Sequence, residues 1–227
     1  MVRFSRLDPL KMSEQGDAAV RGLIVREHIV RAFHGPGIDP PSPETEDTPY
    51  GWVSQSEDVK PKRITPAAVL VPIVERPEGM TVLLTRRTAH LRSHAGQISF
   101  PGGKSEPQDT SAEDTALREA EEEIGLPREQ VEIIGRLRQR TTGTGFHVTP
   151  VVGLIEPAVA LVPDPGEVET IFEVPLPFVL DPENHRIETR LIKGLERQFY
   201  VMPYEGHYIW GLTARLLVAL RNTLGKP

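Results

Sequence analysis

The chain has 227 residues, a formal net charge of −6 and no cysteine. The lack of cysteine excludes disulfides, thiolate catalysis and cysteine-ligated zinc, and the negative charge argues against nucleic acid as a partner. No run of about 18 apolar residues is present, so we expect no membrane span. The first residues lack the apolar core of a signal peptide, which favours a cytoplasmic protein.

The first 60 residues differ in composition from the rest of the chain. Residues 17–33 carry apolar side chains at helical spacing, which predicts an amphipathic helix packed on the folded domain or on a second subunit. Residues 35–56 are rich in proline, glycine and acids and predict a linker. We therefore expect an N-terminal helix and proline-rich linker at 1–60 and one folded domain at 61–227. The spare helix also suggests a homodimer.

The folded domain opens with a predicted β-hairpin. Two apolar runs at 67–74 and 81–85 are separated by a turn at Glu78-Gly79. A polar loop is expected at 86–96. A short strand is predicted at 97–100, and the glycine pair that follows it lets the backbone turn tightly and approach another group closely.

Residues 110–124 have the pattern of an amphipathic helix. Thr110 is the expected N-cap, with Glu113 three residues later completing a capping box. Gly125 is expected to end the helix in the left-handed conformation, and Pro127 prevents continuation. An apolar arc of this helix can pack on a core, and it consists of Ala116, Leu117, Ala120 and Ile124.

The same helix carries three glutamates close together near its C-terminal end. Glu119, Glu122 and Glu123 fall within an arc of roughly 100°. Acids are mildly unfavourable at a helix C-terminus, and like charges at this spacing repel one another. A hard divalent cation such as Mg²⁺, which prefers oxygen ligands, would remove the repulsion. The alternative is a solvated acidic face without a ligand.

The rest of the chain alternates strands and loops before a final helix. A loop at 163–169 contains Glu167, another candidate acid. We predict strands at 131–137, 148–155 and 171–176, a hairpin at 186–192 and 197–203, and a helix at 208–224. Strands on either side of one helix, followed by a final helix, suit an α/β/α sandwich around a mixed sheet.

Two sequence motifs resemble those of a known enzyme family. The run Arg118-Glu119-Ala120-Glu121-Glu122-Glu123-Ile124-Gly125-Leu126 resembles the second half of the Nudix box, R-E-U-x-E-E-x-G-U, where U is a bulky apolar residue. The first half is one residue longer than the general pattern, so the glutamate of that pattern falls at Asp109 or Thr110. Residues 83–103 resemble the extended motif of one Nudix subfamily, the coenzyme A diphosphatases.

The resemblance implies a fold, an activity and a cofactor. The fold would be the Nudix-type α/β/α sandwich with a central mixed sheet, preceded here by a helical extension. The activity would be Mg²⁺- or Mn²⁺-dependent hydrolysis of the diphosphate of coenzyme A or acyl-CoA. Glu119 and Glu123 are the expected metal ligands, with Glu122 as a third, and Arg118 would hold the array. The general base would be either Glu122 or Glu167.

The substrate would be bound by the segment before the helix. Arg86, Arg87 and Arg92 would contact phosphate, because the planar guanidinium offers two donors at once. Gly102 and Gly103 would let backbone N–H groups reach phosphate oxygens. Each arginine alone is as consistent with an ordinary surface residue. Two other functions stay open, namely hydrolysis of a different nucleoside diphosphate derivative such as ADP-ribose or a dinucleotide, and a non-catalytic nucleotide-sensing module.

Overall fold

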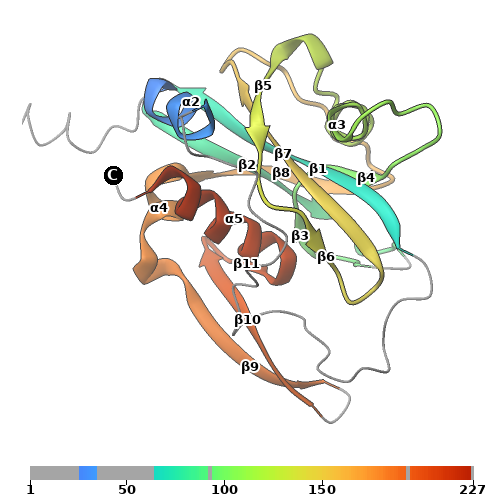
Figure 1. The fold of residues 1–227 in the computed structure, drawn as a ribbon, viewed down its shortest axis with the longest axis vertical. Helices are drawn as coiled ribbons and strands as arrows, with labels where there is room; N and C mark the ends of the chain where they lie inside the picture. Colours follow the sequence, from blue (N-terminus) through green and yellow to red (C-terminus); the bar gives the residue numbers. More distant parts are fainter. Residues whose placement is uncertain (1–25, 35–63, 92–93, 193–194, 226–227) are drawn as a thin grey trace, which may run out of the picture.

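The structure is a computed structural model, and it describes residues 26–34, 64–91, 94–192 and 195–225 (Figure 1). Arg92, the predicted linker and the first part of the predicted N-terminal helix lie outside these residues. None of the helices in the described ranges has the length and apolar character needed to cross a membrane.

The described chain forms two sheets and four α-helices. The helices are α2 (Arg26–His34), α3 (Ala112–Ile124), α4 (Leu176–Leu180) and α5 (Gly211–Leu224). The larger sheet contains β1 (Thr65–Arg76), β2 (Gly79–Arg87), β3 (Ile98–Ser99), β4 (Gly102–Lys104), β5 (Val131–Arg136), β6 (Arg140–Thr141), β7 (Phe146–Ile155) and β8 (Val168–Pro175). The smaller sheet contains β9 (Arg186–Ile192), β10 (Leu195–Tyr204) and β11 (His207–Trp210). Short 3₁₀ turns lie at Arg128–Gln130 and Pro182–Asn184.

The larger sheet is mixed. Its main path runs β3-β2-β1-β7-β5, while β4 pairs with β1, β6 with β7 and β8 with β2. Strands β1 and β7 run parallel, from the pair Thr65 and Phe146 to the pair Val74 and Ile155. The other pairings described in this sheet are antiparallel. A parallel pair at the centre needs a long crossover, and the chain between β1 and β7 includes α3.

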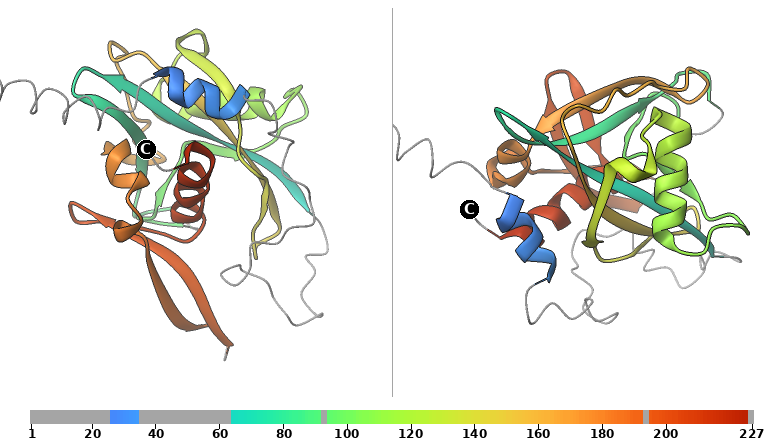
Figure 2. Two further views of the ribbon diagram at one scale, coloured as in Figure 1. Left: turned by 60° about the vertical axis from the view of Figure 1, so that its left-hand side comes forward. Right: turned by 90° about the horizontal axis from the view of Figure 1, so that it is seen from above.

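Helices cover both faces of this sheet, which confirms the predicted α/β/α sandwich (Figures 1 and 2). Because side chains alternate along a strand, neighbouring residues of β1 enter different cores. Leu70 packs in the cluster that contains Ala116, Ala120 and Ile124 of α3. Val71 belongs to the opposite cluster, which also holds residues of α2, α4 and α5.

Helix α2 packs on the chain's own domain. Ile29 is fully buried in the core on the α5 side. Phe33 lies so close to Gly135 of β5 that a Cβ added at Gly135 would come within 2.8 Å of its ring. His28 bonds to the carbonyl of Leu224 at the end of α5, with 3.0 Å between Nε2 and the oxygen. This part of the predicted N-terminal helix therefore covers its own sheet.

Three predicted boundaries are wrong. The final helix begins at Gly211, because Tyr208 and Ile209 alternate between exposed and buried and extend β11 against β10. Arg86 and Arg87 belong to strand β2 rather than to a loop. Gly102 begins a short strand, β4, which pairs with β1.

Candidate active site

Both ends of α3 are fixed by local hydrogen bonds. Ser111 is the N-cap, one residue later than predicted, and its hydroxyl accepts from the N–H of Asp114 at 3.1 Å. Thr110 instead donates its N–H to the Asp114 carboxylate at 3.1 Å. At the other end Gly125 adopts the predicted left-handed conformation, with φ of 64°, and donates to the carbonyl of Glu121 at 3.0 Å. These caps set which side of the helix each glutamate occupies.

The glutamates of α3 divide into an inner and an outer set. The side chain of Glu123 is 3% exposed and that of Glu119 is 16% exposed. Glu122 is 60% exposed, and Glu121 also faces solvent. The two predicted main metal ligands therefore turn toward the sheet, while Glu122 lies at the rim.

Glu123 is held by contacts from two strands of the larger sheet, β4 and β2. Its carboxylate accepts the N–H of Gly102 at 3.2 Å and a guanidinium N–H of Arg87 at 3.2 Å. Burial raises the pKa of Glu123 to about 7 against the opposing effect of Arg87, and the negative charges of Glu167 and Glu119 add to the rise. The Gly102 N–H, which we expected to face a phosphate, here stabilises this carboxylate.

The two glycines of β4 allow close approaches on two different sides of the strand. A Cβ added at Gly103 would lie 2.4 Å from the Oε1 atom of Glu119. A Cβ added at Gly102 would lie 2.5 Å from the carbonyl oxygen of Ala68, and its φ of 156° also disfavours a side chain. Gly103 therefore lets α3 bring Glu119 against β4, while Gly102 lets β4 lie close to β1. Burial raises the pKa of Glu119 as well.

Arg118 links the carboxylates of this region. Its guanidinium donates to both oxygens of Asp109 at 3.0 Å, to Glu119 at 2.9 Å and to Glu122 at 3.0 Å. It also donates to the backbone carbonyl of Lys104 at 3.0 Å. Glu122 is the partner of Arg118 one turn along the helix.

Asp109 is a site residue whose role the sequence left open. Its carboxylate is buried, and the hydrogen bonds from Arg118 hold its pKa well below the usual range. It also accepts the hydroxyl of Thr115 at 2.9 Å. Asp109 follows Gly103 at the same spacing at which the first glutamate of the Nudix box follows its glycine. Counting from Gly103 therefore places Asp109, and not Thr110, at the position of that glutamate. The extra residue lies between Asp109 and Arg118.

Glu167 comes from the loop before β8 and lies beside the inner glutamates. Arg87 joins them, because the same guanidinium that contacts Glu123 donates to Glu167 at 3.4 Å. The backbone carbonyl of Glu167 accepts the N–H of Thr88 at 2.9 Å, which ties the loop to the end of β2. The Glu167 side chain is 49% exposed. The structure therefore brings this distant residue to the candidate site.

The two described arginines of the upstream motif face opposite sides of the sheet. Arg87 turns toward α3, whereas a guanidinium nitrogen of Arg86 lies 3.3 Å from Nδ1 of His207 in β11. His207 stacks on Phe172 with 3.7 Å between ring centroids, and Nε of Arg86 is buried without a hydrogen-bond partner. Arg86 therefore does not join Arg87 at the carboxylates.

The carboxylates form an all-oxygen donor set, which suits a hard divalent cation. The raised pKa values of Glu119 and Glu123 show that both sit where an ionised carboxylate is costly. Within the described ranges, no three His, Asp or Glu side chains lie close enough together to hold a metal ion. Arg118 and Arg87 are bonded to the inner glutamates instead. On binding a cation, Glu119 would give up its contact with Arg118, and Glu123 would give up its contact with Arg87.

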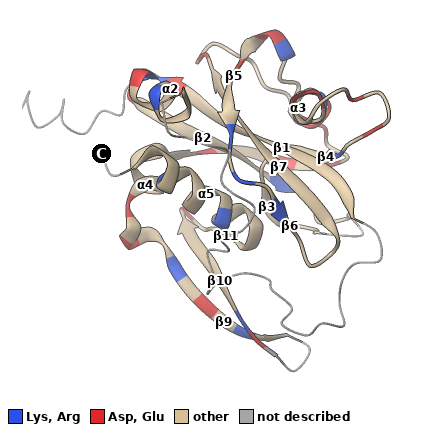
Figure 3. Cartoon of the chain, in the orientation of Figure 1, with Lys and Arg blue, Asp and Glu red and all other residues tan. Residues whose placement is uncertain are grey.

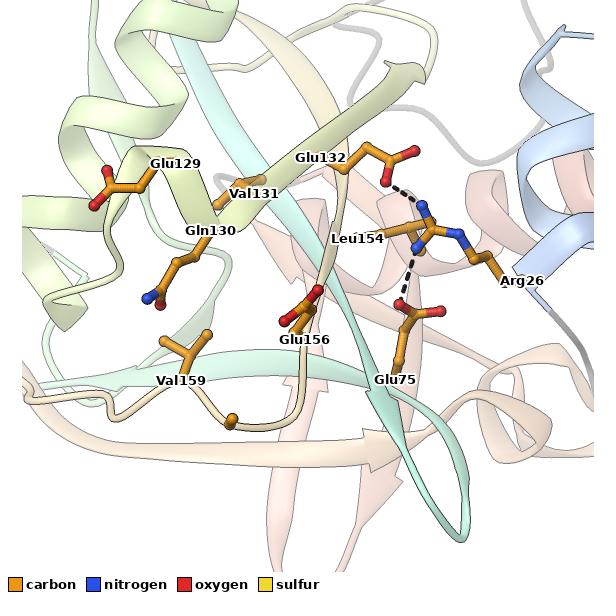
Figure 4. A pocket seen from close by; sticks show the side chains of 10 residues that line it. Arg26, Glu75, Glu129, Gln130, Val131, Glu132, Leu154, Glu156 and Val159 are labelled. Atoms are coloured by element: carbon orange, nitrogen blue, oxygen red, sulfur yellow. Dashed lines mark hydrogen bonds and ion pairs between the residues drawn. The ribbon is translucent and has the colours of Figure 1, made fainter.

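A pocket of about 450 Å³ opens elsewhere on the molecule (Figure 4). Arg26 of α2 lies at its side and pairs with Glu75 at 2.9 Å and with Glu132. Glu129 and Glu156 also line it, so the pocket is acidic and would repel a diphosphate. Along β1, Glu75 lies six residues beyond the position that pairs with Gly102, roughly 20 Å away. We therefore place the site at α3 and β4 rather than in this pocket.

The sequence matches one protein family and several of its members. The family described as the NUDIX domain matches residues 64–191. The chain is 45% identical over 161 residues to a protein of Photorhabdus laumondii subsp. laumondii named "Uncharacterized Nudix hydrolase NudL", a match that covers 69% of this chain and 86% of that protein. It is also 45% identical over 151 residues to the Yersinia pestis protein of the same name, covering 66% and 75% of the two chains.

Solved structures with similar folds include more distant proteins. A MutT/nudix family protein from Enterococcus faecalis aligns over 97% of this chain and 74% of its own, at 15% identity and a TM-score of 0.44. An Ap4A hydrolase from C. elegans aligns over 48% of this chain and 80% of its own, at 20% identity and a TM-score of 0.42.

Proposed function

Since the chain belongs to the Nudix hydrolase family, we propose that it is a divalent-metal-dependent diphosphatase whose substrate is coenzyme A or acyl-CoA. The reaction would add water across the diphosphate and release 3′,5′-ADP and 4′-phosphopantetheine or its acyl form. Nudix hydrolases generally use a divalent metal, and Mg²⁺ or Mn²⁺ is the proposed cofactor here.

One observation carries the proposal. Glu119 and Glu123 lie one helical turn apart on α3, both desolvated, and Arg118 and Gly102 hold their carboxylates in place. A bound cation would act there as a Lewis acid and would lower the pKa of bound water. Each buried carboxylate disfavours folding when it is ionised. A cluster of acids packed against β4 would therefore be unfavourable if its only role were to fill the protein interior.

The chain's own residues divide the remaining work. Asp109 and Arg118 position Glu119 and Glu122. Arg87 reaches the same side of the sheet as the carboxylates, where its guanidinium can pair with a diphosphate oxygen. The substrate-binding roles of Arg86 and Arg92 rest on the motif alone. Arg86 faces the other side of the sheet, and Arg92 lies outside the described residues.

We propose Glu167 as the general base, with Glu122 as the alternative. Glu167 is half exposed on a loop, and its carboxylate has one long contact, 3.4 Å from Arg87. It can therefore reach an attacking water after a small movement. Glu122 is held by Arg118 at 3.0 Å, which leaves it less free to accept a proton. Single Glu167→Gln and Glu122→Gln variants separate the two, because loss of the base should lower kcat while Mn²⁺ affinity stays within a few-fold.

The substrate assignment rests on the motif at residues 83–103, whose resemblance is to the coenzyme A diphosphatases. Purified protein should be incubated with coenzyme A, ADP-ribose and NADH, with and without Mn²⁺, and the products separated. We expect metal-dependent cleavage of coenzyme A to 3′,5′-ADP. Cleavage of ADP-ribose alone would reject the coenzyme A assignment, and cleavage of none of the three would favour a nucleotide-sensing protein.

A further inference from the structure

The smaller sheet has an open edge. Its strand order is β11-β10-β9, and no described strand pairs with the outer side of β9. The β9–β10 hairpin projects from the body of the molecule (Figures 1 and 2). An edge strand presents unpaired N–H and C=O groups, and natural proteins usually protect such edges with charged side chains, especially lysine, with proline or with a bulge. The seven residues of β9, RIETRLI, contain neither lysine nor proline, and their three charged residues are of mixed sign.

The two faces of β9 have different chemistry. One face carries Ile187 and Leu191, which are 44% and 72% exposed and are among the few large apolar side chains in the described chain that face solvent. The other face carries Arg186, Glu188 and Arg190, whose charges alternate in sign along the strand (Figure 3). A partner strand could therefore pack apolar side chains on one face of β9 and place opposite charges against the other face.

The charged side chains are held in place on their face. The Tyr208 hydroxyl donates to Glu188 at 2.6 Å, and Arg190 donates to the Tyr208 hydroxyl at 2.8 Å. The Arg190 guanidinium also lies 5.0 Å from the centre of the Phe199 ring. These contacts reduce the entropy that either side chain would lose on meeting a partner.

A second copy of β9 fits this edge in one register. Along an antiparallel strand, every second residue points its N–H and C=O toward one neighbouring strand, and the residues between them point toward the other. In a symmetric pair, residues that point outward must therefore lie opposite residues that also point outward. Centring the pair on Thr189 places Ile187 opposite Leu191 on one face and Glu188 opposite Arg190 on the other. Centring it on Glu188 instead places two glutamates opposite each other and two arginines opposite each other, which is unfavourable.

We propose that β9 is the contact surface for a second copy of this chain. The two β9 strands pair antiparallel about a two-fold axis at Thr189, and the two three-stranded sheets become one sheet of six strands. The axis makes the contact isologous, so the pairing closes at two copies and does not propagate. This interface differs from the predicted one, because the described part of the N-terminal helix packs on its own domain.

The dimer is expected to be weak. Pairing one seven-residue strand buries less than the roughly 1,200 Å² of a standard stable interface. We therefore expect a dissociation constant of roughly 10–100 μM. Sedimentation velocity of the full chain from 1 to 300 μM should show a rise from monomer to dimer mass. A constant monomer mass over this range would overturn the proposal.

Charge reversal tests the register. Glu188→Arg and Arg190→Glu should each be monomeric at 300 μM, because like charges then face each other across the axis. An equimolar mixture of the two variants should recover the dimer, because every arginine then faces a glutamate. This recovery also shows that both variants are folded. Dimerisation of either single variant with the wild-type constant would overturn the register.

An apolar substitution tests the surface, with a matched control. Leu191→Lys should weaken dimerisation at least about tenfold, since it places a charge on the apolar stripe of the edge. Val162 is 70% exposed and lies away from this sheet, so Val162→Lys should leave the dissociation constant unchanged. Equal effects of the two substitutions would show that association is nonspecific and would contradict the proposal.

Discussion

Glu123 is almost completely shielded from solvent, and this sets how the metal-free protein responds to pH. Its pKa rises from 4.5 to about 7, chiefly through burial. The native state therefore keeps a proton on this group over a range where the unfolded chain has released it. A cation bound nearby favours the ionised form and would reverse this preference.

We predict that the metal-free protein loses stability as the pH rises from about 4.5 to about 7. The folded pKa is the higher one, so the stabilisation is fully present below the unfolded pKa and is lost as the pH passes the folded pKa. The loss is up to about 3 kcal/mol. Urea unfolding in EDTA at pH 5 and pH 8 measures it. Glu123→Gln should lack this component, and an equal pH dependence in the two proteins would contradict the prediction.

Turnover should depend on the same residue. Glu123→Gln is expected to lower kcat at least about 100-fold with the fold intact, because it removes a charged cation ligand. Glu121 is the matched control, since it lies on the same helix but faces solvent. Glu121→Gln should keep wild-type turnover. Turnover of Glu123→Gln within a few-fold of wild type would reject the metal assignment.

Asp109 acts through Arg118 rather than on the substrate. Asp109→Asn removes the buried counter-charge of the partly buried Arg118 guanidinium, so we expect a loss of about 3 kcal/mol in the free energy of unfolding. It should also weaken Mn²⁺ binding in calorimetry, because Glu119 loses its support. Glu113 pairs with Arg136 on the exposed side of the same helix. Glu113→Gln should cost less than about 1 kcal/mol and leave Mn²⁺ binding unchanged.

At the scale of elements, the site depends on how closely α3 approaches β4. The approach is possible because Gly103 has no side chain to meet the Glu119 carboxylate. The inner glutamates thus reach the strand backbone itself, and the Gly102 N–H becomes a hydrogen-bond donor to Glu123.

Gly103→Ala should displace Glu119 without breaking the sheet. The added Cβ would meet the Glu119 carboxylate at 2.4 Å, so that side chain must move. We expect weaker Mn²⁺ binding and at least about tenfold lower kcat, with a circular dichroism spectrum like that of wild type. Gly96→Ala is the control, because a Cβ there meets nothing within 4 Å although its φ is positive. Wild-type Mn²⁺ affinity in Gly103→Ala would refute the close-approach argument.

The sequence predicted the long elements and the short strand β3, but it missed β4 and β11. Strands β1 and β7 are continuous apolar runs, and α3 combines an apolar arc with recognisable ends. Strand β4 has no apolar pattern, and it exists only because Gly102 pairs with Val69 of a distant strand. Strand β11 was assigned to the following helix because Ile209 fits both periods. Local patterns contain no information on such distant pairings.

The candidate site was predictable to a similar extent. Spacing on one helix and a family motif led to Glu119, Glu122, Glu123 and Arg118. That Arg87 bridges Glu123 and Glu167 could not be deduced, because the three lie on β2, α3 and the loop before β8. The division of Arg86 and Arg87 between two faces follows from their places on a strand, which the assignment to a loop concealed.

At the scale of the whole molecule, the segment before the sheet is part of the core. Ile29 of α2 is fully buried against the α5 side of the sheet, and Arg26 pairs with Glu75 and Glu132 from two different strands. Helix α2 therefore closes a face that α5 and α4 leave partly open.

Ile29→Ala should destabilise the protein by about 2–5 kcal/mol, because it leaves a cavity in a packed core. The change lies on the opposite side of the sheet from α3, so kcat at 25 °C should stay within twofold of wild type. Urea unfolding and a turnover assay on the same preparation measure both quantities. A change below about 0.5 kcal/mol would mean that α2 is not part of the folded core.

The parallel pairing of β1 with β7 also determines when the protein can fold. Thr65 meets Phe146 and Val74 meets Ile155, so the central strands join only after the whole of α3 and β5 has been made. Contacts between such distant residues are slow to form. During synthesis, β1 therefore emerges from the ribosome long before β7 exists, although β2 and β4 can already pair with it. The edge of β1 that pairs with β7 remains open until translation has passed residue 155.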